Sequence, residues 1–267
     1  MPTNVPASFG PLLRKWRLTR SYSQQRLASD SEVSTRHLSF LETSRAAPSR
    51  EMVLLLASAL ELPLRERNGL LVAAGFAPVY RESALDGAEL AHVRRALDYV
   101  LAQQEPYGAV VVDRVWNVLR MNVGTMRLFG AVLGDTPPPA RPNVVDLLFA
   151  PGPFREAVVN WEEVAGPLVE RLHREIAAEP EDQERRTLLA TILAYPDVPQ
   201  DYREARLETV RPFVPLQLRV RGEELRFFTM ISTLGTPLDV TAQELRIETY
   251  FPADDATELW CRNAARA

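Results

Sequence analysis

The sequence of 267 residues contains one cysteine, Cys261, and one lysine, Lys15. A single cysteine excludes an internal disulfide framework and any cysteine-rich zinc site. A serine–lysine peptidase needs a desolvated lysine as its base, and beyond Lys15 the chain has no lysine that could act as one. These absences exclude three common kinds of site before any motif is considered.

Histidine is also scarce, and His37, His92 and His173 lie far apart in the sequence. None belongs to a His-x-x-x-His pattern, so a metal site is poorly supported. His92 or His173 could serve as a single axial ligand of a haem, but a histidine on a helix surface is the ordinary interpretation of each. With no Walker loop either, the sequence offers no constellation for an enzyme.

Long apolar runs are missing as well. No stretch of about eighteen or more apolar residues occurs, so no transmembrane helix is expected. The first ten residues lack the basic-then-apolar layout of a signal peptide. Together with the lack of a disulfide framework, this predicts a cytoplasmic protein without a membrane partner.

The composition is that of a folded protein, with 46% hydrophobic and 25% charged residues, and the length suits two domains. Residues 1–81 carry eleven Lys and Arg against six Asp and Glu, whereas the remainder carries twenty against twenty-nine. A basic N-terminal part on an acidic body is consistent with one end meeting a polyanion. The same balance also suits an ordinary solvated surface.

The N-terminal part shows the apolar spacing of five short helices. Ser23, Ser34 and Ser49 can cap the second, third and fourth of them, because a serine oxygen can accept a hydrogen bond from a first-turn N–H. Pro63 suits the first position of the fifth helix, and Gly75 ends it.

The sequence as a whole predicts an α+β protein. An all-helical domain over residues 1–76 is followed by a linker at 77–88 and a mixed domain at 89–267. Asn122 can cap a helix that Gly130 ends. Strands are expected at residues 109–112, 116–121, 214–220, 224–233 and 243–251, and helices at 90–104, 154–178 and 181–193.

In the N-terminal domain, residues 24–29 and 34–43 have the spacing of a helix-turn-helix, with residues 30–33 as the turn. A small core must fix the angle between the two helices so that the second can enter the major groove of DNA. That core is expected from Leu27, Ala28, Val33, Leu38 and Leu41. Arginine suits a guanine or a phosphate, threonine a base or a thymine methyl, and glutamines at the preceding helix start suit phosphates. The residues expected at DNA are Ser23, Gln24, Gln25, Ser34, Thr35, Arg36, His37, Ser39, Phe40 and Arg45.

This segment resembles the helix-turn-helix of the Xre and phage-repressor family over the first seventy-odd residues. The match rests on Ser23-Gln24-Gln25-x-Leu27-Ala28, Val33 through Glu42, Arg45 and Pro48-Ser49. It implies sequence-specific binding of double-stranded DNA. Glu32 and Ser44 stand where the family usually has glycine, which adopts left-handed backbone angles at lower cost. The alternative is a five-helix interaction module that touches no DNA.

In the second domain, residues 110–130 run as strand, turn, strand, asparagine and helix, and resemble the opening of a PAS domain. Such domains are curved antiparallel sheets whose concave face, covered by helices, forms a ligand cavity. Nearly the whole chain resembles the MmyB-like regulators, which join an Xre helix-turn-helix to a PAS-type ligand-binding domain. That match rests on Glu105-Pro106-Tyr107, Val111-Val112-Asp113, Asn160-Trp161-Glu162, Gly235-Thr236-Pro237-Leu238-Asp239 and Phe251-Pro252-Ala253-Asp254.

The resemblance implies a regulator with a ligand-binding domain, and a homodimer is expected because two helix-turn-helix units can occupy successive major grooves. Methionines and aromatics form adaptable apolar walls, which favours a fatty acid, another acyl chain or a similar lipid-like molecule. Asn160, Trp161 and Arg155 are candidate donors to a carboxylate head. The expected ligand contacts are Val112, Trp116, Met121, Met126, Phe129, Phe154, Arg155, Asn160, Trp161, Phe213, Phe227 and Met230. The alternative is a second domain with a filled core that serves only dimerisation or protein contact.

Overall fold

A computed structural model describes residues 8–198 and 215–266 of the chain. The chain divides into two units, each with a hydrophobic core of its own. The first unit comprises the residues up to Ala84 together with Thr236–Gln243, and the second comprises Leu85–Gly235 and Glu244–Ala267. The expected α+β fold, a helical N-terminal part followed by an antiparallel sheet with a helical insertion, is confirmed.

The N-terminal part of the first unit is built from five helices. Leu13, Trp16 and Leu56 are among the side chains buried at its centre. Pro63 has an extended backbone with ψ of 157°, so the fifth helix begins at the next residue and the expected helical position for this proline was wrong. The helices are α1 (Phe9–Thr19), α2 (Gln24–Asp30), α3 (Thr35–Glu42), α4 (Arg50–Ala59) and α5 (Leu64–Ala73).

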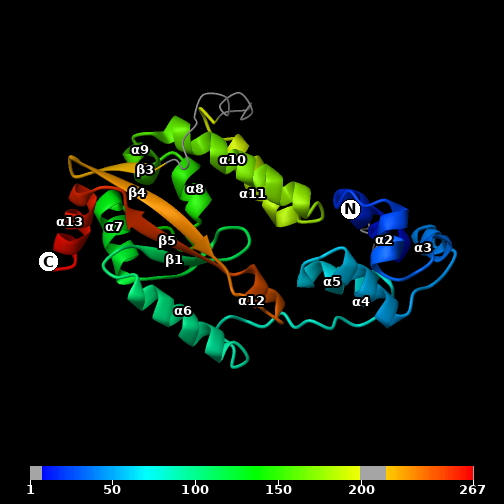
Figure 1. Ribbon diagram of the computed structural model, residues 1–267. Helices are drawn as coiled ribbons and strands as arrows, with labels where there is room; N and C mark the ends of the chain where they lie inside the picture. The colour runs from blue at the N-terminus through cyan, green and yellow to red at the C-terminus, as the bar shows by residue number, and fades with distance from the viewer. Residues whose placement is uncertain (1–7, 199–214, 267) are drawn as a thin grey trace. The chain divides into compact units, whose positions relative to one another are not determined.

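The second unit contains a five-stranded sheet in the order β2-β1-β5-β4-β3, with every neighbouring pair antiparallel (Figure 1). The five expected strands are confirmed, with shifts of up to three residues at their ends. The strands are β1 (Ala109–Val112), β2 (Val118–Met121), β3 (Leu216–Val220), β4 (Glu223–Ser232) and β5 (Arg246–Pro252).

The two faces of this sheet bury different side chains, because successive residues of a strand point to opposite faces. Ala109 and Val111 pack with α6 (Ala91–Gln103) in a small cluster. Val110 and Val112 belong to the larger core on the other face. The same alternation in β5 assigns Ile247 to the α6 cluster and Tyr250 to the larger core.

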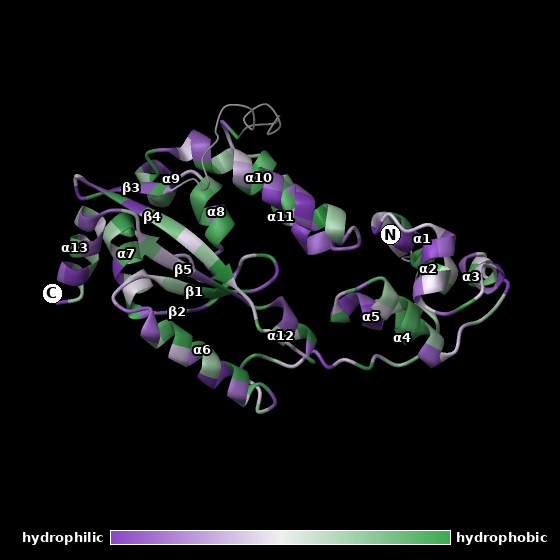
Figure 2. Cartoon of the chain, viewed as in Figure 1, coloured by the Kyte–Doolittle hydropathy of each residue, from purple (hydrophilic) through white to green (hydrophobic). Residues whose placement is uncertain are grey.

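The larger core is covered by the helices inserted between β2 and β3. Figure 2 shows α8 as almost entirely hydrophobic, whereas α10 and α11 alternate between hydrophobic and hydrophilic residues, as amphipathic helices do. The inserted helices are α7 (Val123–Leu133), α8 (Val144–Phe149), α9 (Pro153–Ala157), α10 (Trp161–Ala178) and α11 (Gln183–Leu193).

One helix expected over residues 154–178 is broken. The N–H of Val159 donates to the carbonyl oxygen of Gln217 at 2.8 Å, and Val158 forms an isolated bridge with Leu218. The backbone at this point therefore pairs with β3, and two helices, α9 and α10, stand on either side of it. This long-range pairing leaves no trace in the local apolar spacing.

Three short helices were not expected from the sequence. Asn143 caps α8 by accepting hydrogen bonds from Val145 N and Asp146 N, and Asp254 caps α13 (Asp255–Ala264) by accepting one from Thr257 N. The third, α12 (Val240–Glu244), comes between β4 and β5. The segment Thr236–Gln243 packs in the first unit, where Val240 N donates to Arg81 O at 2.8 Å.

Candidate functional sites

The helix-turn-helix is fixed by caps at the start of both of its helices. The Ser23 hydroxyl oxygen accepts a hydrogen bond from Arg26 N at 3.0 Å, and the Ser34 oxygen accepts one from His37 N at 3.1 Å. Both caps confirm the expectation from sequence. They satisfy N–H groups that have no partner within the helix and so define where α2 and α3 begin.

The expected core between these helices is also confirmed. Leu27, Ala28, Leu38 and Leu41 are buried, and Val33 is half-buried against them. These side chains come from α2, the turn and α3. Their packing sets the angle at which α3 leaves the turn, as a recognition helix requires.

A buried ion pair that sequence analysis missed ties α3 to α1. Arg17 Nε donates to Glu42 Oε1 at 2.6 Å, and Gln24 Nε2 donates to Glu42 Oε2 at 2.7 Å. The two helices meet closely, since a Cβ added at Gly10 would lie 2.4 Å from the carbonyl oxygen of Leu41. The side-chain amide of Gln24, expected at a phosphate, is thus engaged with Glu42.

The other residues expected at DNA lie on the outward side of the motif. Thr35 and Arg36 are exposed at the start of α3, and the guanidinium carbon of Arg36 lies 5.4 Å from the ring centroid of Phe40. His37, Ser39 and Phe40 are half-buried, whereas Ser23, Gln25, Ser34 and Arg45 are exposed. The structure thereby places short polar groups and Arg36 at the N-terminal half of one capped helix, and Arg45 beyond its C-terminal end.

The two positions where glycine was expected adopt left-handed backbone angles. The φ angle is 54° at Glu32 and 57° at Ser44. Both turns therefore keep the conformation that glycine favours, at a cost of about 1–2 kcal/mol for a residue with a Cβ.

The second unit encloses a cavity of about 350 Å³ between the sheet and the inserted helices. This volume lies in the usual range of small-molecule sites, about 300–1,000 Å³. Phe129, Phe154 and Phe227 are the expected ligand residues that line it, and the first two meet edge to face at 4.8 Å between centroids. Its walls comprise Leu128, Phe129, Val144, Leu147, Leu148, Phe154, Val164, Pro167, Leu168, Leu216, Leu218, Phe227, Thr229, Glu248 and Tyr250.

Several expected ligand residues lie elsewhere. Val112 is buried in the core, Met121 is half-buried against it, and Met126 and Met230 are 50% and 55% exposed. Phe213 lies outside the described residues. Apolar character alone therefore did not identify the cavity wall.

Trp116 has a structural environment of its own. Its ring carries the guanidinium groups of Arg171 and Arg246, at 4.5 Å and 5.0 Å from its centroid, and its indole N–H donates to Glu175 Oε2 at 3.4 Å. Arg246 also pairs with Glu175 at 2.9 Å. This cluster joins β5 to α10 beside the cavity without forming part of its wall.

The three expected donors to a carboxylate head have other partners or positions. Asn160 donates to Pro215 O at 2.7 Å and accepts from Gln217 N at 3.0 Å, which holds the chain at the start of β3. Trp161 donates its indole N–H to Leu148 O at 2.9 Å. The guanidinium of Arg155 lies 3.6 Å from the Trp161 ring centroid.

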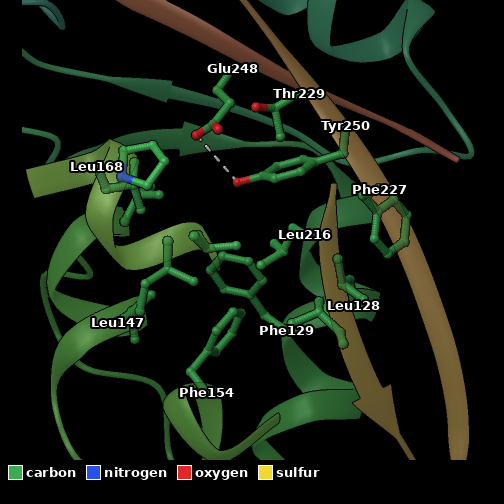
Figure 3. A pocket seen from close by; sticks show the side chains of 15 residues that line it. Leu128, Phe129, Leu147, Phe154, Leu168, Leu216, Phe227, Thr229, Glu248 and Tyr250 are labelled. Atoms are coloured by element: carbon green, nitrogen blue, oxygen red, sulfur yellow. Dashed lines mark hydrogen bonds between the residues drawn. The ribbon is translucent and has the colours of Figure 1, made fainter. Parts of the chain in front are cut away.

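The polar part of the cavity was missed by sequence analysis. It consists of Thr229 from β4 with Glu248 and Tyr250 from β5, and Figure 3 shows the three together at one end. The Tyr250 hydroxyl donates to Glu248 Oε2 at 3.5 Å, and burial raises the pKa of both groups. The sequence does contain a signal for part of this group. Glu248 and Tyr250 are two residues apart in an expected strand, so their side chains share one face of the sheet.

Across the described ranges 8–198 and 215–266, no cluster of three or more His, Cys, Asp and Glu side chains could hold a metal ion. None of the helices described is long and apolar enough to cross a membrane.

Comparison with family models gives two matches, both in agreement with the architecture. Residues 13–67 match the helix-turn-helix model, and residues 93–263 match the model of the MmyB-like transcription regulator ligand binding domain. A comparison with curated proteins finds no match. The ligand-binding match covers the sheet, the inserted helices and more than half of the sequence, and the chain therefore belongs to the family of MmyB-like transcription regulators.

Proposed function

We propose that this regulator binds a specific DNA operator as a homodimer, and that its second unit binds a small molecule with a long aliphatic chain. The observation that carries the ligand half is the cavity, in which twelve of the fifteen lining residues are apolar. Fatty acids and other acyl compounds are the commonest biological source of such chains. The strand order β2-β1-β5-β4-β3 supports the expected likeness to PAS sensor domains.

The DNA half of the proposal follows from the exposed start of α3. Arg36 reads a guanine or holds a phosphate, and Thr35 contacts a neighbouring base or methyl group. Two protomers place their α3 helices about 34 Å apart in successive major grooves, so the operator is pseudo-palindromic. Ligand binding changes operator affinity by the difference in ligand affinity between the DNA-competent and DNA-incompetent states.

The DNA half is tested with an operator selected from random duplexes. In fluorescence anisotropy at fixed salt, Arg36→Ala combined with Thr35→Ala should weaken operator binding by about 10- to 100-fold and relax base preference. Arg174→Ala, which removes an equal charge from an exposed site on α10, should leave both unchanged. An intact double variant with full affinity and full preference would refute this assignment.

The ligand half is tested by thermal unfolding with straight-chain alcohols and acids, and by mass spectrometry of organic extracts of the purified protein. A ligand at one hundred times its Kd should add about 2.7 kcal/mol of stability. Leu147→Trp, which fills the cavity, should abolish the shift, whereas Leu259→Trp on exposed α13 should keep it. Empty extracts and no shift with any probe would reject a ligand role for the cavity.

A further inference from the structure

The cavity has a strongly uneven distribution of polarity. Leucine, valine and phenylalanine side chains make up most of its wall, and the polar groups of Thr229, Glu248 and Tyr250 gather at one end (Figure 3). Glu248 and Tyr250 are 8% and 5% exposed, whereas Thr229 is exposed at the edge of the cavity. An aliphatic ligand would therefore place its head against the carboxyl group of Glu248.

Glu248 is an unusual group to find in such a wall. A buried carboxylate is costly unless hydrogen bonds or a cation compensate it. None of the described residues that line the cavity is a Lys, Arg or His. The Tyr250 hydroxyl donates to Glu248 at a long 3.5 Å, and the Thr229 side chain also hydrogen-bonds to it.

Arg171 is the cation that acts on Glu248, and its charge partly offsets the rise in pKa that burial causes. Arg171 does not line the cavity, however. Its Nε donates to Glu175 at 3.0 Å, and its guanidinium lies over the Trp116 ring. The carboxyl group at the polar end is thus left with acceptor capacity that a ligand can use.

We propose that the cavity selects an aliphatic molecule whose head donates hydrogen bonds to Glu248, a hydroxyl or an ammonium group, over one that ends in a free carboxylate. This inference rests on the proposed function, because it assumes that the cavity holds an aliphatic chain. Within that function it names the chemistry of the head.

The chemistry disfavours a carboxylate head for two reasons. Two carboxyl groups in contact cannot both ionise, so one of the two must hold a proton while a carboxylate head is bound. The donors expected for such a head are also absent from the wall, since Asn160 and Trp161 donate to backbone carbonyls and Arg155 stacks on an indole. A hydroxyl or ammonium head instead donates to Glu248 and meets the hydroxyl groups of Thr229 and Tyr250.

The test uses the full chain and three probes with the same twelve-carbon chain: 1-dodecanol, dodecylamine and sodium dodecanoate, each below its micellar concentration. Kd values are measured by titration calorimetry near neutral pH. The wild-type protein should bind the alcohol and the amine at least about tenfold more tightly than the acid, which is about the net worth of one hydrogen bond.

Glu248→Gln keeps the shape of the side chain but removes its charge and half of its acceptor capacity. This variant should bind the amine about tenfold more weakly and the acid more tightly than wild type does. Glu223→Gln, which removes an exposed carboxylate at the start of β4, should leave all three Kd values unchanged. Tyr250→Phe gives a second variant, in which the preference against the acid should persist.

The outcomes separate the inference from the function beneath it. Equal binding of the three probes, or tighter binding of dodecanoate, overturns the head assignment while the aliphatic cavity stands. An unchanged ranking in Glu248→Gln also overturns it. If no probe binds, the proposed ligand role fails and the inference falls with it. If Glu248→Gln does not fold, the wild-type ranking alone decides.

Discussion

The guanidinium group of Arg17 donates two hydrogen bonds to the carboxylate of Glu42, from Nε to Oε1 at 2.6 Å and from Nη2 to Oε2 at 3.0 Å. The Arg17 side chain is 8% exposed and that of Glu42 is 1% exposed. The pair joins the last turn of α1 to the last residue of α3. The recognition helix α3 is therefore fixed to α1 by a buried ion pair in addition to its apolar core.

Removing one member of this pair should destabilise the N-terminal domain strongly. Glu42→Ala leaves Arg17 and Gln24 without their shared acceptor, and breaking a buried pair in this way costs about 3–5 kcal/mol. The free energy of unfolding is measured by urea titration followed by circular dichroism. Asp30→Ala is the matched control, because its pair with Arg26 is solvent-exposed at 3.7 Å and should contribute less than about 1 kcal/mol. Equal losses in the two variants would contradict the role given to Glu42.

The left-handed residues in the two turns predict stabilising substitutions. Glu32→Gly and Ser44→Gly should each raise the free energy of unfolding by about 0.5–1 kcal/mol, because glycine relieves the φ angles of 54° and 57° but loses more chain entropy on folding. Glu32→Ala and Ser44→Ala keep the Cβ and should not show this gain. If the alanine variants were as stable as the glycine variants, backbone strain would not be the cause.

The helix-turn-helix could be predicted from sequence because its determinants are local. Ser23 and Ser34 cap helices that begin at the next residue, and Leu38 and Leu41 are three apart on one helix. The Arg17–Glu42 pair was not predictable in the same way, since its members are twenty-five residues apart and either could have been solvated.

The cavity shows the same limit more clearly. The flexible, apolar side chains of Met126 and Met230 predict ligand contacts, but the faces of α7 and β4 on which they lie are exposed. Residue type alone gives no reason to place Glu248 in a core, because charged residues are seldom buried. Its position follows from the pairing of β5 with both β1 and β4, which buries that strand in the middle of the sheet. Which residue lines a cavity thus depends on contacts between distant segments.

The single cysteine allows a reaction that reports on one site. Cys261 is buried on α13, and burial raises the pKa of its thiol from 9.0 to about 11. The thiolate is the reactive form, so near pH 8 the folded chain should react with iodoacetamide about a hundredfold more slowly than the chain in denaturant. Raising the pH by one unit should speed the folded reaction about tenfold while the fold is retained. Equal rates with and without denaturant would contradict this burial.

Phe154 should set the length of chain that the cavity accepts. Phe154→Ala removes one ring of the pair with Phe129, which should cost about 3 kcal/mol of stability and enlarge the cavity. A sixteen-carbon alcohol should then raise the melting temperature more than a twelve-carbon one, relative to the wild-type response. Phe228→Ala disrupts a stacked pair with Phe251 outside the cavity and should leave that preference unchanged. A preference that shifts equally in both variants would point to general loosening of the domain.

The segment Thr236–Gln243 connects the two strands that carry the polar end of the cavity, yet it packs in the first unit. Gln243 Oε1 accepts a hydrogen bond from Leu64 N at the start of α5, at 2.7 Å. Asp239 Oδ2 accepts one from Ser83 N at 3.1 Å. Only a short length of chain separates β4 and β5 from Asp239 and Gln243. A ligand that displaces either strand would therefore disturb the hydrogen bonds of these residues to the first unit.

Breaking these two hydrogen bonds should weaken the coupling between ligand and operator more than it weakens either binding event. Asp239→Ala combined with Gln243→Ala removes the acceptors of Leu64 N and Ser83 N, and also that of Ala242 N within α12. The recognition helix keeps its core, and the cavity keeps all of its lining residues. The ratio of operator Kd values with and without ligand should approach one. Coupling is a free energy between two binding sites, and the contacts that would link them are lost in this variant. Gln217→Ala, on β3 outside this segment, provides the control. A double variant with the wild-type ratio would show that the signal takes another route, even if both Kd values were unchanged.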